Sequence, residues 1–96
     1  MKTFRTYQLA KELHHNTKRL KLRGPERDQF QRACLSVLLN LAEGSAKPTV
    51  KDRKRFYFIA FGSLREVQCL LDLFGDQELI GEADILAAHL YRLCHS

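Results

Sequence analysis

The strongest hydrophobic pattern in the chain lies in its middle, between residues 32 and 44. Only Arg32, Ser36, Asn40 and Glu43 interrupt the apolar residues there, and their spacings of 4, 4 and 3 place them on one narrow stripe of a helix. A surface helix usually buries a single face, whereas this one is apolar around most of its circumference. We therefore expect it to be buried against the rest of the protein and against a second subunit.

The same periodicity predicts four helices, at about residues 4–22, 25–43, 49–74 and 82–94. No alternating strand pattern and no Asn-Gly hairpin turn occurs in the sequence. The expected helix ends rest on glycine, proline and capping residues: Thr3, Gly24, Pro25, Gly44, Thr49, Asp52 and Gly75. Short connections place consecutive helices antiparallel, so the predicted fold is all-α, a single up-down-up-down four-helix bundle.

Within these helices, heptad spacing predicts which side chains face inward. In the third helix the expected inward set is Phe56, Ala60, Ser63, Val67, Leu70 and Phe74, and in the fourth it is Ile85, Leu86, Leu90 and Leu93. Gly62 lies in mid-helix, where glycine costs about 1 kcal/mol relative to alanine. Either another helix approaches it closely, within the bundle or across an interface, or the glycine is simply tolerated.

Composition and length limit the class of protein. A chain of 96 residues with 45% hydrophobic residues is one globular domain. Its apolar runs are too short to span a membrane, and its start lacks the apolar segment of a secretory signal. Cys34, Cys69 and Cys94 form no C-x-x-C pair and lie in apolar helical positions, which predicts buried free thiols in the cytoplasm.

The charges divide unevenly along the chain. Residues 1–55 hold 14 Lys and Arg against 5 Asp and Glu, a net +9, whereas residues 56–96 hold 2 against 6, a net −4. In an antiparallel bundle, basic residues then gather at the end that holds both termini and the second loop: Lys2, Arg5, Lys47, Lys51, Arg53, Lys54, Arg55 and Arg92, against Glu43 and Asp52. This basic end predicts phosphate contacts with a nucleic acid, with Tyr57 and Phe58 nearby to stack on bases. The alternative is a solvated basic rim that only aids solubility.

The opposite end is expected to be neutralised. Its basic residues are Lys18, Arg19, Lys21, Arg23 and Arg27, and its acidic residues are Asp72, Asp76, Glu78, Glu82 and Asp84. Di-iron bundles use Glu-x-x-His motifs on two helices, whereas here only Glu12 and His15 have that spacing, and no Gly-x-Ser-x-Gly motif or phosphate-binding loop occurs in the sequence. We therefore expect no catalytic residue, no metal and no cofactor.

Two motifs resemble those of a known family. The residues Gln31-Arg32-Ala33, Ser36 and Asn40-Leu41-Ala42-Glu43-Gly44, followed by Ile59-Ala60-Phe61-Gly62-Ser63-Leu64-Arg65-Glu66, resemble the signatures of the ribosomal-RNA intervening-sequence proteins, also called the four-helix bundle protein family. Tyr7-Gln8-Leu9-Ala10 fits that family's first helix, so the resemblance covers about residues 4–74. It implies a homo-oligomer in the form of a pentameric ring of bundles.

The resemblance also indicates which residues maintain the structure: Arg32, Asn40, Glu43, Gly44, Gly62, Ser63 and Glu66. Because a buried carboxylate needs a partner, Glu43 is expected to pair with a basic side chain such as Arg32 of a neighbouring subunit, or with backbone amides near Thr49. A binding or catalytic role for Asn40 and Glu43 is the alternative.

Together these patterns predict a non-enzymatic pentamer that binds structured RNA through Lys47, Lys51, Arg53, Lys54, Arg55, Lys2 and Arg5. The alternative function is a scaffold that recruits another protein through the apolar second and third helices. No membrane partner is expected.

Overall fold

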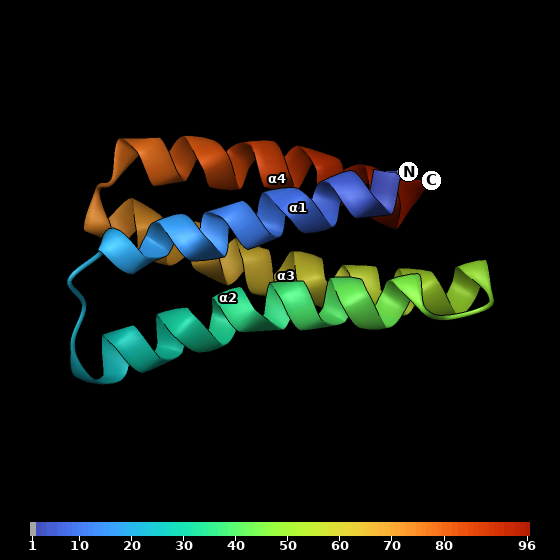
Figure 1. The fold of residues 1–96 in the computed structure, drawn as a ribbon, viewed down its shortest axis with the longest axis horizontal. Helices are drawn as coiled ribbons and strands as arrows, with labels where there is room; N and C mark the ends of the chain where they lie inside the picture. The colour runs from blue at the N-terminus through green and yellow to red at the C-terminus, as the bar shows by residue number, and fades with distance from the viewer. Residues whose placement is uncertain (1) are drawn as a thin grey trace.

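The computed structural model describes residues 2–96, except for the side chain of Lys2. These residues form four helices: α1 (Lys2–Asn16), α2 (Gly24–Ser45), α3 (Val50–Phe74) and α4 (Gln77–His95). Successive helices run in opposite directions, so that both termini and the α2–α3 connection share one end of the molecule (Figure 1). The predicted all-α, up-down-up-down four-helix bundle is confirmed.

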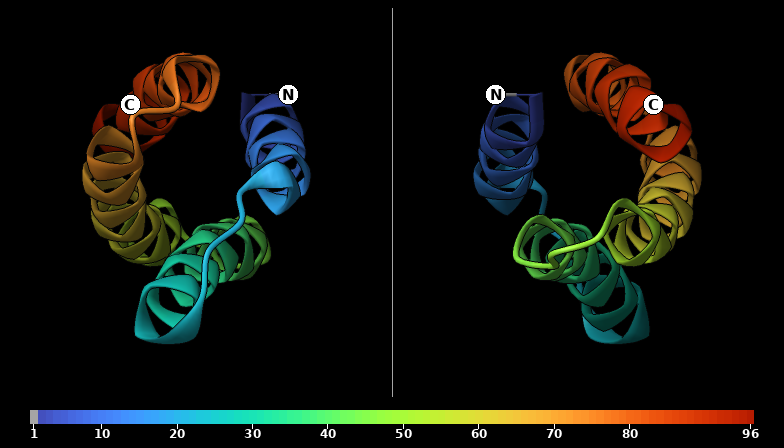
Figure 2. Two further views of the ribbon diagram at one scale, coloured as in Figure 1. Left: turned by 90° about the vertical axis from the view of Figure 1, so that its left-hand side faces the viewer. Right: turned by 90° about the vertical axis from the view of Figure 1, so that its right-hand side faces the viewer.

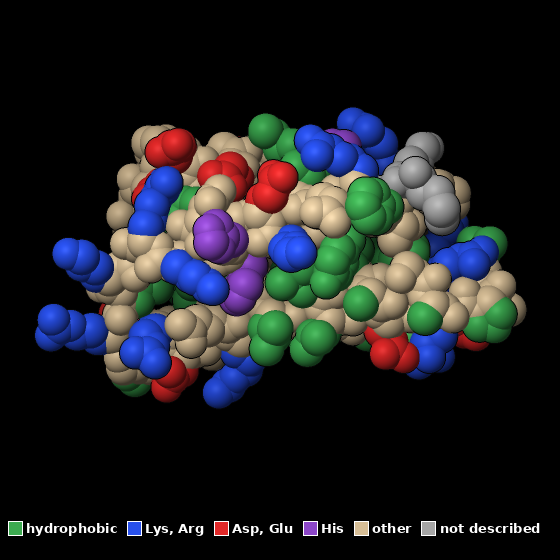
Figure 3. Space-filling view, viewed as in Figure 1, with side chains coloured by type: hydrophobic (Ala, Val, Ile, Leu, Met, Phe, Trp, Pro, Cys, Tyr) green, Lys and Arg blue, Asp and Glu red, His purple; other side chains and the backbone are tan. Residues whose placement is uncertain are grey.

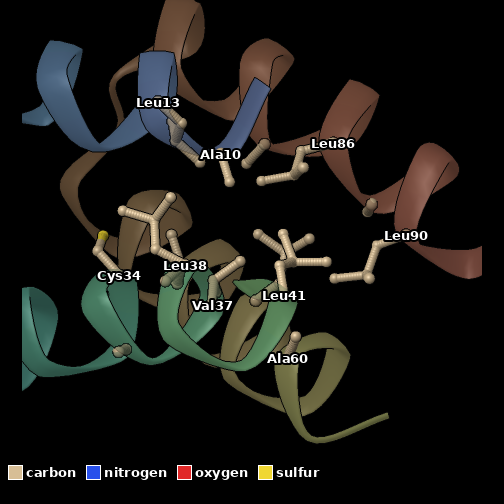
Figure 4. Packing of buried hydrophobic residues seen from close by; sticks show 14 of the residues in the cluster. Ala10, Leu13, Cys34, Val37, Leu38, Leu41, Ala60, Leu86 and Leu90 are labelled. Atoms are coloured by element: carbon tan, nitrogen blue, oxygen red, sulfur yellow. The ribbon is translucent and has the colours of Figure 1, made fainter. Parts of the chain in front are cut away.

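The four helices enclose one hydrophobic core. Each helix packs against its neighbours in the chain, and α1 packs against α4 to close the ring (Figure 2). In the close view of the core, Leu41 of α2 and Leu90 of α4 point toward each other (Figure 4), and both are fully buried. The most extensive helix pair is α2 with α3. None of the helices described combines the length and the apolar character that a membrane crossing requires.

The ends of α3 follow the expected capping chemistry. The backbone N–H of Asp52 donates to Thr49 Oγ1 at 3.2 Å, and Gly75 ends the helix with a positive φ of 75°. A positive φ is accessible to glycine at little cost, and the Gly75 N–H then reaches the carbonyl of Leu71 at 2.9 Å. The predicted cap at Thr49 and the C-terminal glycine of α3 are confirmed, and of the two bonds of a capping box the structure shows the one to the Thr49 hydroxyl.

The ends of α1 and α4 differ from the prediction. Helix α1 stops at Asn16 and continues as a 3₁₀ turn, Thr17–Arg19, rather than reaching residue 22, and Thr3 lies inside the helix rather than at its cap. Helix α4 begins at Gln77, five residues before the expected start, because Asp76 accepts a hydrogen bond from the Leu79 N–H at 3.0 Å and caps the helix there.

Gly44 does not stop α2 as expected. The helix continues to Ser45, and Gly44 is buried where α3 approaches most closely. A Cβ atom at this position would lie 2.8 Å from Tyr57 Cε1 and 3.0 Å from Phe56 Cβ. Gly62, by contrast, is exposed, and a Cβ there would meet no atom within 4 Å. The close helix approach that was expected at Gly62 therefore occurs, within this chain, at Gly44.

Some apolar side chains that were expected to be buried are exposed. Leu35 and Leu39 of α2 remain in water, with 59% of Leu39 accessible, so a single chain does not bury most of the circumference of this helix. Ile85 of α4 is exposed as well, whereas Leu86, Leu90 and Leu93 are buried as predicted. Cys34 and Cys94 are buried thiols, but Cys69 is exposed, so the prediction was wrong for that cysteine. Each of these exposed positions lies on the outer face of its helix.

Candidate functional site

The predicted basic residues lie at the end of the bundle that carries the α2–α3 connection. Some are paired with other groups of the chain, and others are exposed to solvent. Lys47 Nζ pairs with Glu43 Oε2 at 2.8 Å and lies 5.1 Å from the centre of the Phe56 ring. Arg53 donates from Nη1 to the carbonyl of Lys47 at 3.1 Å. These two cations therefore help to hold the connection in place.

Other cations at this end face the solvent. Lys51 and Arg55 are exposed on α3, and Arg5 and Arg92 are exposed on α1 and α4. Lys54 is half-buried near Cys94 of α4, and its charge opposes the burial that raises the pKa of that thiol to about 11. The side chain of Lys2 lies outside the described residues. The basic end thus presents cations from α1, α3 and α4.

A groove of about 590 Å³ opens at this end, and Arg53 and Lys54 are the cations that line it. It is lined by residues of all four helices or their ends: Thr3, Ser45, Val50, Arg53, Lys54, Tyr57, Leu93 and Ser96. The hydroxyls of Thr3 and Tyr57 lie 3.4 Å apart within it. Lys, Arg and hydroxyl side chains are the usual contacts of phosphate oxygens, so this lining is suited to the backbone of a nucleic acid.

The aromatic residues at this end divide into a buried and an exposed one. Only 5% of Tyr57 is accessible, so its ring is part of the core and is not available to a base. Phe58 is 49% exposed and contacts the ring of His95 with 5.6 Å between centroids. Sequence reasoning missed His95, although the i, i+4 spacing of Tyr91 and His95 places both on one face of α4.

The opposite end is only partly neutralised. Arg19 pairs with Asp76 at 2.8 Å and with Glu78 at 3.4 Å. The hydrogen bond with Asp76 raises the pKa of Arg19, and the Arg19 guanidinium, together with the Leu79 N–H, lowers the pKa of Asp76. The remaining cations of this end are exposed: Lys18, Lys21, Arg23 and Arg27. Basic and acidic side chains lie side by side on the face shown in Figure 3.

A half-buried histidine, His14, lies next to this end. Nδ1 of His14 has no hydrogen-bond partner, and burial, followed by the positive charges of Lys18 and His15, lowers the pKa of His14. The ring lines a groove of about 370 Å³ between α1 and α2. Hydrophobic side chains are visible between these two helices in Figure 3.

The two sequence motifs meet on the outer side of the α2–α3 pair. Ser36 Oγ and Ser63 Oγ lie 2.7 Å apart, and the Asn40 amide donates back to the Ser36 carbonyl at 2.8 Å. About two turns from Ser36 along α2, the Gln29 amide donates to the carboxylate of Glu66 on α3. The motifs therefore join the two helices through polar contacts outside the core.

Glu43 differs from the prediction. Its side chain is exposed in the single chain and pairs with Lys47. It was expected to accept hydrogen bonds from backbone amides near Thr49, but the Asp52 N–H there donates to the Thr49 hydroxyl. Arg32 is also exposed. Glu43 was expected to be buried because its helix is so apolar, but it lies on the outer stripe of that helix.

Beside this polar seam lies an exposed apolar surface. On α2 it consists of Leu35, Leu39 and Ala42, and on α3 it includes Ile59 and Leu73. Scattered exposed apolar residues are ordinary, but spacings of 4 and 3 along α2 place these three on one stripe. Such a stripe is typical of a helix that packs against another chain.

The fold and these surfaces define the chain as a small antiparallel four-helix bundle protein with one basic end and an exposed apolar stripe. The chain belongs to the 23S rRNA-intervening sequence protein family, whose model matches residues 2–94. The resemblance deduced from the two motifs is thereby confirmed, and it extends through α4. No curated protein and no solved structure is significantly similar to the chain.

Proposed function

We propose that this protein is a non-enzymatic homo-oligomer, a pentamer of bundles, that binds structured RNA through its basic end. The observation that carries the proposal is the gathering of cations from α1, α3 and α4 at one end of the bundle, where Arg53 and Lys54 of α3 also line a groove. Of the two acidic residues at this end, Glu43 is already paired with Lys47. The binding is electrostatic and only weakly selective, because phosphate contacts carry no sequence information.

The apolar stripe of α2 supports the oligomer. Leu35 and Leu39 remain in water in the single chain, and burying them against another copy removes apolar surface from water. In a ring, the basic ends of successive bundles form one positive rim. Such a rim would attract a polyanion more strongly than a single bundle does. The free cysteines suit a cytoplasmic protein.

The RNA proposal is tested with two variants of equal charge. One replaces Lys51, Lys54 and Arg55 by alanine and keeps Arg53, whose bond to the Lys47 carbonyl holds the connection. The control replaces Lys18, Lys21 and Arg23 by alanine at the other end and keeps Arg19 with its partner Asp76. Each variant loses three positive charges, so a general effect of net charge is the same in both.

Binding of a structured RNA is measured at several salt concentrations by fluorescence anisotropy. The basic-end variant should bind more weakly, and the slope of log K against log salt should decrease by about 2, since roughly 0.7–0.9 counterions are released per phosphate contact. Equal losses in the two variants would contradict the assignment of the basic end. A parent protein that binds no RNA at any salt concentration would refute the function.

The oligomer is tested by native mass. Light scattering of the parent should give a multiple of 11.1 kDa, with a pentamer as the expected state. The Leu35→Lys, Leu39→Lys double variant should shift the mass toward the monomer while its circular dichroism remains helical. A parent protein that stays monomeric at micromolar concentration would eliminate the oligomer.

The exposed apolar stripe also favours a second candidate function, a scaffold that recruits another protein through α2 and α3. The two candidate functions differ in whether the protein binds RNA. A protein that does not bind RNA at low salt, and whose stripe is covered by a different chain, would be a scaffold.

A further inference from the structure

We propose that the outer seam between α3 and α4 is a stacking platform for unpaired bases, as in the single-stranded segments of a structured RNA. This inference rests on the proposed RNA binding and specifies which part of the RNA is contacted. It concerns a row of four aromatic rings, Phe58 and Phe61 of α3 and Tyr91 and His95 of α4, which we call the aromatic row.

The rings of the aromatic row contact one another in sequence. Phe58 meets His95 edge-on at 5.6 Å between centroids, and His95 stacks on Tyr91 at 4.0 Å with 26° between the planes. Tyr91 in turn lies 6.1 Å from Phe61. The row therefore runs as one continuous surface along the seam.

The aromatic row is held in place before any ligand binds. His95 Nδ1 donates to the Tyr91 carbonyl at 2.9 Å, which fixes the orientation of the imidazole ring. The guanidinium of Arg65 lies 4.8 Å from the centre of the Phe61 ring, and its Nη1 donates to Gln68 at 2.9 Å. A surface ordered in advance loses less side-chain entropy when a ligand stacks on it.

Three rings of the aromatic row face water, whereas Phe61 is partly buried and packs against the core. Tyr91 is 53% exposed and Phe58 is 49% exposed, and His95 is exposed at the end of α4. Aromatic side chains bury large areas when they can, so a run of half-exposed rings in mutual contact is a surface suited to a flat ligand.

The surrounding charge selects the ligand. Arg92 follows Tyr91 directly in α4, and Arg55 precedes Phe58 by about one turn in α3. Residues 85–96 include no Asp or Glu. Rings bordered by arginines match the two parts of a single strand, since bases stack on the rings and phosphates pair with the guanidinium groups.

The stacking platform predicts a preference for single strands over duplexes that the basic end alone does not predict. In a duplex the faces of the bases are covered by their neighbours, so a duplex offers the rings little to stack on. A single strand should therefore bind better than a duplex of the same length, and its bases, not only its phosphates, should contribute. The preference among the four bases is small because each base has a π-face.

Two tryptophan variants locate the contact. The chain has no Trp, so Tyr91→Trp introduces a single reporter into the aromatic row. Phe4→Trp is the matched control, because Phe4 is 65% exposed near the same end of the bundle but lies on α1, outside the row. A short oligouridine should quench the fluorescence of Tyr91→Trp and leave that of Phe4→Trp almost unchanged. Equal quenching, or none in Tyr91→Trp while the oligomer binds, overturns the platform.

Affinity measurements complete the test. The Phe58→Ala, Tyr91→Ala double variant should bind oligouridine about 5- to 150-fold more weakly than the parent for each stacked base that is lost. Its affinity for an abasic strand of the same length should not change. Tyr91→Phe keeps a ring and should bind as the parent does, and Phe4→Ala is the control for losing an exposed ring elsewhere.

The outcomes separate this inference from the proposed function. If the parent binds abasic and base-bearing strands equally and the double variant binds like the parent, the electrostatic function stands and the platform is wrong. If the double variant loses native mass, the aromatic row is a contact between chains and the platform is likewise wrong. If the parent binds none of these strands at low salt, both proposals fail together.

Discussion

Replacing Gly44 by alanine tests the close packing of α2 against α3. The added Cβ would lie 2.8 Å from Tyr57 Cε1 and 3.0 Å from Phe56 Cβ. Neither atom moves easily, since the Tyr57 ring is buried and the Cβ of Phe56 is fixed to the backbone of α3. Overpacking of a core costs about 1–3 kcal/mol, and the helical preference of alanine over glycine returns about 1 kcal/mol. These ranges leave a net loss of up to about 2 kcal/mol, with a midpoint of about 1 kcal/mol, and each kcal/mol lowers the melting temperature by about 4–8 °C in a domain of this size.

Gly81→Ala is the matched control. Gly81 also lies inside a helix but is exposed, and a Cβ there would meet no atom within 4 Å. This variant should be more stable than the parent by about 0.5–1 kcal/mol, because only the helix-propensity difference acts. Thermal unfolding followed by circular dichroism, at one protein concentration for all variants, compares the three proteins. A Gly44→Ala variant that melts at or above the parent would show that the two helices separate at no cost.

Three further predictions concern single side chains. Burial is the main cause that lowers the pKa of His14 below 6.5, so the unfolded chain takes up a proton at a higher pH than the folded chain. The free energy of unfolding should therefore fall as the pH drops below about 6.5. Denaturant titrations at several pH values should show a weaker pH dependence for His14→Gln. Asp76→Ala should lower the melting temperature because α4 loses its cap, whereas Asp76→Asn, which also caps helices, should lower it less. In the folded protein a thiol-specific reagent should modify the exposed Cys69 rapidly. It should modify Cys34 only after unfolding, because burial raises the pKa of Cys34 to about 12. Fast labelling of a folded Cys69→Ser variant would contradict this.

The sequence predicted the fold well where local chemistry determines the outcome. Thr49 caps α3 as expected, and Gly75 ends it, because an N-cap side chain and a positive-φ glycine act within a few residues. The predicted start of α4 was five residues too late because the prediction did not include Asp76, whose side chain caps the helix.

The sequence was less informative about the surface. The periodicity of α2 marks Leu35 and Leu39 as apolar but does not distinguish the core of one chain from the contact between two. The same ambiguity explains why Glu43 was expected to be buried. The aromatic row was missed because its rings come from two helices, and only the packing of α3 on α4 brings Phe58 next to His95. Positions of charged residues along the chain, in contrast, sufficed to locate the basic end, since antiparallel order alone decides which loops share an end.

The antiparallel order also determines where foreign sequence can be attached. Both termini lie at the end that carries the α2–α3 connection and its cations (Figure 1). An acidic affinity tag at either terminus would therefore lie beside the surface that is proposed to bind RNA and would compete with the RNA for those cations. The segment between the 3₁₀ turn and α2, residues 20–23, lies at the opposite end, and its exposed residues make it the better place for a label. Binding measured with a terminal tag should be compared with binding after the tag has been removed.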